Sequence, residues 1–299
     1  MRELSVIIVN HNSLSCMVKT LSSLSRNLYP LDHEVIVVDN ASSDGSVEVI
    51  RREFPSVKLI ALPENVGFAK ANNQGAKQAS GHFLLLLNSD TSVPAGTVEK
   101  LIEIKKSHPD IGIVAPLVFY PDESLQISWG KDLHLISEVF LKYFAKKWYG
   151  WQFKKKKGKM NRNVDWVSGA CFLIELRLYK QVRGFDEKFF LYIEDADLGR
   201  RIRQLGHKIH LTSEARIIHY KGEAVSKYPG RFLHEAKKSQ MYYYGKHNGR
   251  FSAALLRSYL LLRFHIKHFF SRWQGNLQNQ EIYANVISAI KEIHFENPT

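Results

Sequence analysis

The start of the chain alternates between two hydrophobic periods, and this alternation limits the folds that it can adopt. Unbroken apolar runs, which predict buried strands, are separated by segments whose apolar residues follow helical spacing. In chain order, the strands and helices predicted in this way are residues 4–10, 13–28, 34–40, 44–54, 57–62, 67–79 and 83–87. This order predicts a mainly parallel sheet, because strands covered by helices on both faces read as continuous Val, Ile and Leu runs. We therefore expect an α/β fold with helices on both sides of a central sheet.

The rest of the chain is less regular. We expect helices over 98–107 and 195–206, strands over 111–119, 164–175, 207–212 and 215–220, and an exposed loop around the lysine run at 154–159. The last part of the chain becomes basic, with helical spacing of its apolar residues. We expect a main domain over residues 1–228 and a basic, amphipathic helical region over residues 229–299.

The composition indicates an anionic partner and a reducing compartment. The formal net charge is +13, which fits nucleic acid, a phosphorylated ligand or an acidic lipid surface, and the sign alone leaves these open. The two cysteines, Cys16 and Cys171, provide no disulfide framework, and the apolar run at 4–10 is too short for a secretion signal. These features predict a cytoplasmic protein.

Residues 251–273 are apolar and basic and contain no acidic residue. Arg257, Arg263 and Lys267 interrupt the segment, so it offers no uncharged span of about 18 residues and does not predict a transmembrane helix. Two readings stay open. The segment is either a helix that lies in the membrane interface or a helix that packs on the main domain.

Polar residues follow the predicted strands of the first half, and the carboxyl ends of parallel strands are where such sheets bind ligands. They are Asn10 and Asn12 after the first strand, Asp39 after the second, and Asn88, Ser89 and Asp90 after the fourth. A turn residue is the alternative for Asp39, and a helix cap is the alternative for Asp90. A carboxylate at a rigid strand end suits Mg²⁺ or Mn²⁺ bound to the phosphate oxygens of a substrate, so Asp90 is the expected ligand.

A second acidic cluster, Glu194, Asp195 and Asp197, opens the predicted helix after the apolar "FFLYI". The helix dipole favours acids at this position and accounts for one or two of them. An acid that projects from a helix start can also act as a general base, and we assign this role to Asp195. His219 ends a predicted strand, where it is either structural or a second metal ligand beside Asp90.

Several catalytic motifs are missing from the sequence. It contains no G-x-S-x-G, no P-loop, no G-x-G-x-x-G after the first strand and no paired metal-binding cysteines. These absences disfavour serine hydrolases, P-loop enzymes and dinucleotide oxidoreductases.

The motifs that are present resemble a known family. In order they read "SVIIVNHNS", "EVIVVDNASSDGS", "ENVGFAKANNQG", "LLLLNSD", "WVSGACFLI", "GFDEKFFLYIEDADLGRRIRQLG" and "IIHYKGEAVSK". Together, over roughly residues 4–227, they resemble the inverting family 2 glycosyltransferases, and within them the rhamnosyltransferase-like branch of bacterial polysaccharide synthesis. The resemblance implies a GT-A fold, which binds a nucleotide-diphospho-sugar donor.

The resemblance also implies roles for individual residues. Asn88-Ser89-Asp90 stands where the family has its D-x-D metal motif, with Asp90 as the ligand and Asn88 in place of the first Asp, which implies a contact to ribose and a weaker metal site. Asp195 matches the catalytic base, and His219 matches a histidine that binds metal in some members. The remaining donor-side positions are Asn10, Asn12, Asp39, Asn65, Gly67, Asn72, Trp166, Gly169 and Glu194. Trp166 and Gly169 would line the sugar and acceptor side.

The residues and the resemblance agree on one reaction. An acceptor hydroxyl, deprotonated by an Asp base, displaces a metal-bound nucleoside diphosphate in a single inverting step. The expected acceptor is a glycan or a polyprenyl-linked sugar, and the expected location is the inner face of the cell membrane, held by an anionic surface. The alternatives are a non-catalytic nucleotide- or glycan-binding scaffold and a nucleotidyltransferase, which would need a Gly-rich basic loop after the first strand. A nucleic-acid-binding protein is disfavoured because no recognised module for it occurs.

Overall fold

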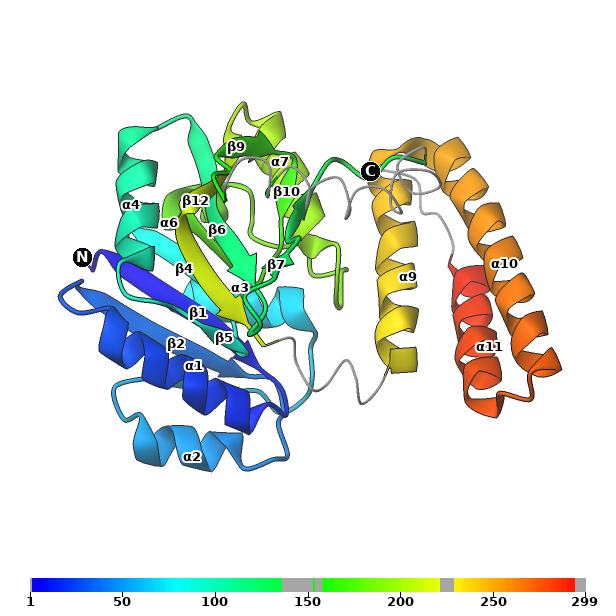
Figure 1. The fold of residues 1–299 in the computed structure, drawn as a ribbon, viewed down its shortest axis with the longest axis horizontal. Helices are drawn as coiled ribbons and strands as arrows, with labels where there is room; N and C mark the ends of the chain where they lie inside the picture. The colour runs from blue at the N-terminus through cyan, green and yellow to red at the C-terminus, as the bar shows by residue number, and fades with distance from the viewer. Residues whose placement is uncertain (1, 136–152, 154–157, 221–228, 294–299) are drawn as a thin grey trace.

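The computed structural model describes residues 2–135, 153, 158–220 and 229–293 (Figure 1). The predicted lysine loop at 154–159 therefore lies mostly outside the described residues. The first part of the chain forms the predicted alternation of strands and helices. Its elements are β1 (Leu4–Asn10), α1 (Leu14–Asn27), β2 (His33–Asp39), α2 (Ser46–Glu53), β3 (Lys58–Ala61), α3 (Phe68–Lys77) and β4 (Phe83–Asn88).

The following elements extend and cover this sheet. They are β5 (Thr91–Ser92), α4 (Thr97–Ser107), β6 (Ile111–Phe119), β7 (Leu125–Gln126), β8 (Trp129–Gly130), β9 (Arg162–Val164), β10 (Trp166–Val167), β11 (Cys171–Glu175), α6 (Leu176–Gln181), α7 (Glu194–Gln204) and β12 (Lys208–His219). The central sheet runs in the order β3-β2-β1-β4-β11-β6-β12-β5, and β7 and β9 pair with β6 and β12. The pairings of β1 with β2 and β4, of β2 with β3, and of β6 with β12 are parallel, while β11 lies antiparallel between β4 and β6.

Alternate side chains of each central strand enter different cores, as the continuous apolar runs predict. Ile7, Leu84 and Leu86 join the core under α3, α6 and α7, whereas Val6, Ile8 and Leu85 join the core under α1 and α4. Cys16 and Cys171 are buried and are not joined in a disulfide, and burial raises the pKa of Cys171. The fold is thus an α/β sandwich with helices on both faces of a mostly parallel sheet.

The prediction of two separate strands near residues 207–212 and 215–220 was wrong, because a single strand, β12, covers Lys208–His219. Its pairing with β6 shifts register between Thr212 and Arg216 and then continues. Such an irregularity leaves extra residues unpaired without ending the strand. The polar Ser213 and Glu214 at that point made the sequence look like a break.

Among the residues that the structure describes after the sheet, three helices occur: α9 (Pro229–His247), α10 (Gly249–Trp273) and α11 (Leu277–Glu292). They pack on one another, and α9 stands between the sheet domain and the other two (Figure 1). Buried residues of these helices, such as Met241, Leu256 and Ile290, continue the core that lies under α7. None of the helices within the described ranges has the length and apolar character needed to cross a membrane.

Candidate functional site

Asp90 and His219 meet at the carboxyl edge of the sheet. Asp90 follows β4 directly, and β12 ends beside it, where His219 pairs with Thr91 of β5. The Oδ1 atom of Asp90 lies 3.0 Å from Nε2 of His219, and the Asn88 amide lies 3.5 Å from the same ring nitrogen. Both Asp90 and His219 are buried. Asp90 does not cap the following helix, since α4 begins at Thr97 after Gly96.

A further residue, Gln126 of β7, holds the other side of the His219 ring, with Oε1 3.1 Å from Nδ1. When Nδ1 donates to this oxygen, Nε2 turns its lone pair toward the Asp90 carboxylate. In that state Asp90 Oδ1 and His219 Nε2 both present lone pairs, 3.0 Å apart, and a cation between them relieves their repulsion. This pair of donor atoms therefore fits a divalent metal ion. Gln126 was missed by the sequence analysis because a glutamine in an irregular segment gives no signal.

No third His, Cys, Asp or Glu side chain joins Asp90 and His219 to form a larger cluster among the residues that the structure describes.

The ends of β1 and β2 are tied together by polar side chains. The Asn10 amide donates to Asp39 Oδ2 at 2.9 Å, and the Ser42 backbone N–H donates to Asp39 Oδ1 at 2.9 Å. Asp39 is therefore both a turn residue and part of the site edge. Asn12 is exposed, and its Oδ1 accepts the backbone N–H of Ser43 at 2.8 Å.

Ser13 links the ends of β1 and β4. It stands at the expected start of α1, but its hydroxyl makes no capping bond there. Instead it donates to Asn10 Oδ1 at 2.7 Å and lies 3.0 Å from the hydroxyl of Ser89. The predicted residues Asn10 and Ser89, 79 positions apart in the chain, are thereby brought to one edge.

The segment around Asn65 and Gly67 forms the turn into α3. Asn65 Oδ1 accepts from the Asn40 amide at 2.9 Å and from the Gly67 N–H at 3.0 Å. Gly67 has φ +86°, and a Cβ there would lie 2.5 Å from the Phe190 carbonyl oxygen, so glycine is required on both counts. Asn72 is buried, and its amide donates within α3 to the Phe68 carbonyl at 2.9 Å.

The first turn of α7 carries Asp195. The two residues before the helix, Tyr192 and Ile193, both have positive φ, at 69° and 71°. Such backbone strain in a non-glycine residue, and above all in a β-branched one, is found mainly at functional sites. Asp195 keeps partial solvent exposure, and its carboxylate accepts from Ala196 N–H at 2.7 Å and Gly169 N–H at 3.3 Å. The protein around this carboxyl displaces its water and raises its pKa to about 6.

Glu194, next to Asp195, is buried, and within the described residues its Oε2 has no hydrogen-bond partner. Burial, and then the charge of Asp195, raise the pKa of Glu194 well above its usual value. The two neighbouring acids therefore do not both ionise readily, and Glu194, the more buried of the two, loses its proton less readily.

The sheet brings Asp195 to the edge that carries Asp90. The Asn88 N–H, at the end of β4, donates to the Ala170 carbonyl at 3.0 Å, and the next residue back, Gly169, donates to Asp195. The antiparallel pairing of β11 with β4 fixes this arrangement. Two hydrogen bonds and a few residues of backbone thus connect acids that are 105 positions apart in the chain.

Trp166 lies in β10, three residues before Gly169. Its indole N–H donates to the Lys131 carbonyl at 2.9 Å, and its ring lies against Gly130, where a Cβ would come within 2.7 Å. These contacts hold the "WVSGA" segment in place. The predicted contact of Trp166 with a sugar stays a prediction.

Asp197 is fully buried and fully paired, a feature that the sequence analysis did not detect. It contacts Arg201 at 2.7 Å, Lys246 at 2.7 Å and His247 at 2.6 Å. Burial alone would raise its pKa, but the hydrogen bond from His247 and the charges of Arg201 and Lys246 outweigh burial and lower it to about 2. Lys246 and His247 belong to α9, so this cluster fastens α9 to the helix that carries Asp195.

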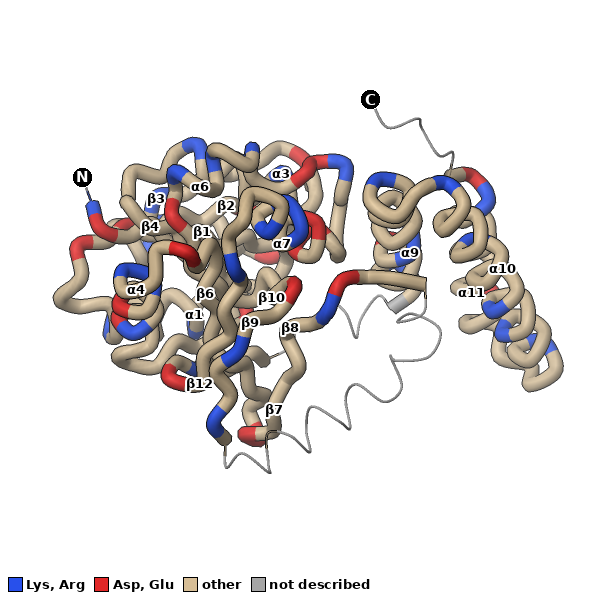
Figure 2. The backbone as a smooth tube through the Cα atoms, turned by 90° about the horizontal axis from the view of Figure 1, so that it is seen from above, with Lys and Arg blue, Asp and Glu red and all other residues tan. Residues whose placement is uncertain are grey.

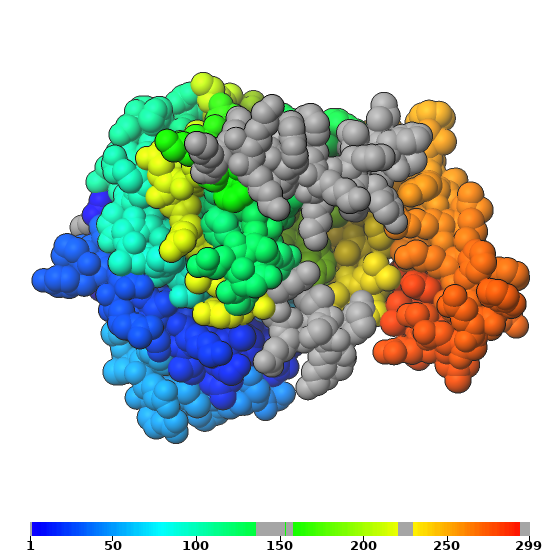
Figure 3. All heavy atoms as spheres, viewed as in Figure 1, coloured from blue at the N-terminus to red at the C-terminus, as the bar shows by residue number. Residues whose placement is uncertain are grey.

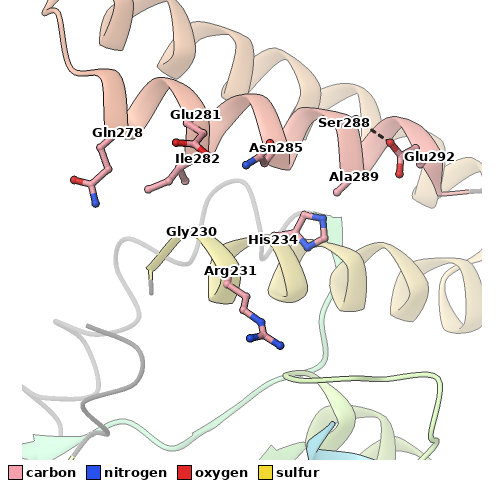
Figure 4. Close-up of a pocket in the computed structure, with 10 residues that line it drawn as sticks. All are labelled: Gly230, Arg231, His234, Gln278, Glu281, Ile282, Asn285, Ser288, Ala289 and Glu292. Carbon is pink, nitrogen blue, oxygen red and sulfur yellow. Dashed lines mark hydrogen bonds between the residues drawn. The ribbon is translucent and has the colours of Figure 1, made fainter. Parts of the chain in front are cut away.

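A hollow of about 620 Å³ opens elsewhere, between α9 and α11 (Figure 4). It is lined by residues of α9, among them Arg231 and His234, and by residues of α11, among them Glu281 and Glu292 (Figure 4). None of the predicted site residues lines it. The chemistry described above therefore belongs to the sheet edge and not to this hollow.

Sequence comparison finds a match to a family model described as glycosyl transferase family 2, over residues 5–183. The chain is also 27% identical over 252 residues to the N-acetylglucosaminyl-diphospho-decaprenol L-rhamnosyltransferase of Mycobacterium tuberculosis, covering 78% of this chain and 82% of that protein. The family match ends before α7, so Asp195 and His219 lie beyond it.

Solved structures with a GT-A fold resemble this one. The structure of GalNAc-T7 with UDP, GalNAc and Mn²⁺ has a TM-score of 0.58 and 18% identity, over 82% of this chain and 50% of that one, so this chain spans half of it. The mannosyltransferase PcManGT from Pyrobaculum calidifontis, with GDP-Man and Mn²⁺, has a TM-score of 0.56 and 15% identity, over 97% of this chain and 86% of that one. At these identities the likeness establishes the fold.

Proposed function

Because the chain belongs to glycosyl transferase family 2, we propose that it transfers a sugar from a nucleoside diphosphate donor to an acceptor hydroxyl with inversion at the anomeric carbon. One observation carries this proposal. The hydrogen bonds from Asn88 to Ala170 and from Gly169 to Asp195 hold a base candidate beside the strand end that carries Asp90. A single displacement needs these two groups at one edge, one toward the leaving group and one toward the incoming hydroxyl.

The donor is proposed to lie along the ends of β1, β2 and β4. The residues assigned to its base, ribose and sugar are Asn10, Asn12, Asp39, Asn65, Gly67, Asn72, Asn88, Ser89, Trp166, Gly169 and Glu194. Asp90 and His219 would hold Mg²⁺ or Mn²⁺, with Gln126 orienting the imidazole. When bound, the cation stabilises negative charge on the diphosphate leaving group.

Asp195 is proposed to act as the general base. Its carboxylate takes the proton of the acceptor hydroxyl while the hydroxyl oxygen forms a bond to the anomeric carbon. The bond from that carbon to the diphosphate oxygen breaks, and the nucleoside diphosphate leaves. A pKa of about 6 keeps Asp195 ionised at neutral pH and still basic enough to accept the proton.

The substrates are proposed from the relative's name and from the branch that the motifs resemble. We propose dTDP-rhamnose as donor, with UDP- or GDP-hexoses as alternatives, and a polyprenyl-diphosphate-linked sugar or a growing polysaccharide as acceptor. Such an acceptor places the enzyme at the inner face of the cell membrane. We further propose residues 1–228 as the transferase domain and 229–299 as the region that associates with the membrane.

Nucleotide binding and product stereochemistry test the proposal. Thermal unfolding is measured with dTDP, UDP or GDP, each with and without Mg²⁺ or Mn²⁺. The nucleotide that stabilises the protein selects the donor, which is then incubated with polyprenyl-diphosphate-linked N-acetylglucosamine. We expect a glycoside of inverted anomeric configuration. Retention of configuration contradicts the mechanism, and nucleotide binding without any transfer supports the scaffold alternative.

The metal assignment has its own test. Asp90→Ala should lose the extra thermal stabilisation that metal adds to the nucleotide, because one of two protein ligands is gone. Asp195→Asn is the matched control, since it changes an acid of the same edge that lies on the acceptor side. Equal metal dependence in the two variants would remove Asp90 from the metal site.

A further inference from the structure

Helix α10 leaves an unusual amount of apolar surface exposed. Among the described residues, most of the large apolar side chains that are open to solvent lie on this helix or just after it. They are Phe251, Leu255, Leu262, Ile266, Phe269, Phe270, Trp273 and Leu277. Phe251 and Trp273, near its two ends, are 78% and 79% exposed, so the exposure runs along the whole helix. A contiguous exposed apolar surface of this kind marks an interaction site.

The exposed side chains form one stripe opposite the packed face. With about 100° of rotation per residue, positions 251, 255, 262, 266, 269 and 273 fall within about 60° of the helix circumference. The buried positions 253, 256, 260, 264 and 271 fall on the other side, against α9 and α11. The helix therefore has two apolar faces, and core packing accounts for only one of them.

The charge of α10 indicates what the outer stripe contacts. The helix carries Arg250, Arg257, Arg263, Lys267 and Arg272 and no acidic residue (Figure 2). Of these cations, Arg263 and Arg272 fall on either side of the stripe, whereas Arg257 donates to the Lys291 carbonyl and Lys267 lies over the Tyr283 ring of α11. Two copies of this helix packed stripe to stripe would bring the flanking cations together without acids to pair with them. A surface of anionic headgroups supplies the opposite charge, and apolar side chains flanked by Lys and Arg are typical of helices that lie in the membrane interface.

We propose that the exposed stripe of α10 is a docking surface for an anionic lipid bilayer, on which the helix lies parallel to the membrane plane. The inference rests on the proposed function only in that a lipid-linked acceptor requires the enzyme to reach a membrane. Figure 3 shows α10 and α11 protruding from the sheet domain, so the stripe can approach a flat surface. The α9 cluster around Asp197 links this surface to the helix that bears Asp195.

The apolar part is tested with a triple variant, Leu262→Ser, Phe269→Ser and Trp273→Ser, in the full chain. Sedimentation with vesicles of phosphatidylglycerol and phosphatidylcholine should show affinity at least about tenfold weaker than that of the unchanged protein. Tyr29→Ser is the matched control, because Tyr29 is 86% exposed and lies far from α10 in the sequence, next to α1. An unchanged nucleotide-induced thermal shift shows that the triple variant is folded.

The charged part is tested with Arg263→Gln and Arg272→Gln together, against Arg51→Gln and Lys77→Gln, which remove the same charge from α2 and α3. The α10 pair should weaken vesicle binding by about 30-fold, which corresponds to about 1 kcal/mol for each of the two cations, and the control pair should not. Added salt and pure phosphatidylcholine vesicles should weaken binding in the same way. Binding that both variant pairs reduce equally would overturn the assignment to α10.

A second copy of the chain is the competing occupant. If the unchanged protein sediments as a dimer, the triple variant as a monomer, and neither binds vesicles, the stripe is a dimer interface and the proposal is wrong. Failure of the proposed function gives a different result. Asp195→Asn should bind vesicles normally without transferring sugar, whereas the triple variant should still use a short-chain, water-soluble acceptor and fail with one embedded in vesicles.

Discussion

Asp195 and Asp197 both lie in the first turn of α7, yet the pKa of one is raised and the pKa of the other is lowered. Asp195 accepts backbone N–H groups from Ala196 and Gly169, and its pKa rises to about 6. Asp197, two residues on, is bound by Arg201, Lys246 and His247, and its pKa falls to about 2. Both carboxyls lie in the same helix dipole and both lose water to the protein. The difference therefore comes from the cationic partners and not from the helix.

The difference separates a group that can exchange a proton from a group that cannot. A general base is most effective with a pKa near the working pH, as at Asp195. A carboxylate with a pKa of about 2 is a poor base but a strong attachment point, and Asp197 uses it to hold α9. The following predictions test whether Asp195 serves catalysis while Asp197 serves the attachment of α9.

Asp195→Asn should produce the largest change. The amide keeps the size of the carboxyl but cannot accept the acceptor proton, so kcat should fall by about 10²–10⁴-fold. Transfer assays measure the loss, and nucleotide binding and thermal stability should stay close to those of the unchanged protein. Asp122→Asn, at an exposed turn, should retain full turnover. Normal turnover in Asp195→Asn would remove this residue as the base.

Asp197→Asn should act on stability. Removing one partner from a buried ion cluster leaves the cations uncompensated, which typically costs about 3–5 kcal/mol in the free energy of unfolding. Urea denaturation of Asp197→Asn and Asp195→Asn side by side measures the contrast, since the second variant removes no ion pair. Equal unfolding free energies for the two variants would mean that the Asp197 cluster does not hold α9.

The residues of the site that follow from local sequence pattern could be predicted from the sequence. Asp90 ends an apolar run and Asp195 begins a helix, and in a parallel sheet such positions share one edge. Asp197 stood in the same acidic cluster but received no role. Its partners Lys246 and His247 lie about 50 residues away on a helix whose docking no periodicity encodes.

Contacts between distant segments also explain where the structure differs from, or goes beyond, the other predictions from sequence. The polar Ser213 and Glu214 suggested a break that the pairing of β12 with β6 bridges. Two readings of residues 251–273 were left open because hydrophobic spacing counts apolar positions without saying what covers each face. The structure shows α10 packed on one face and exposed on the other, so one of its two apolar faces belongs to the core and the other lies open to solvent.

The pH dependence of kcat/KM should report Asp195 alone. The base is active when ionised, and its pKa is raised to about 6, so kcat/KM should fall about tenfold per pH unit below that value. Asp197 has a lowered pKa of about 2, so the stability that it contributes is present above the unfolded value of about 4 and is lost only as the pH falls from there toward 2. Rates and unfolding measured across pH 4.5–8 separate the two. A kcat/KM that stays constant down to pH 4.5 would contradict the raised pKa of Asp195.

Glu194→Gln should give the smallest change in kcat/KM of these variants. It tests whether the raised pKa of Asp195 depends on a charge at Glu194. Burial raises the pKa of Glu194 and favours its neutral form, and a neutral amide of the same shape in place of that form removes no charge next to Asp195. We expect kcat/KM to fall by less than about tenfold, or ~1.4 kcal/mol, with the acid limb still near pH 6. If Glu194 were instead ionised, its negative charge would itself raise the pKa of Asp195. In that case the substitution would lower the pKa and move the acid limb to lower pH, which a profile measured in both proteins would reveal.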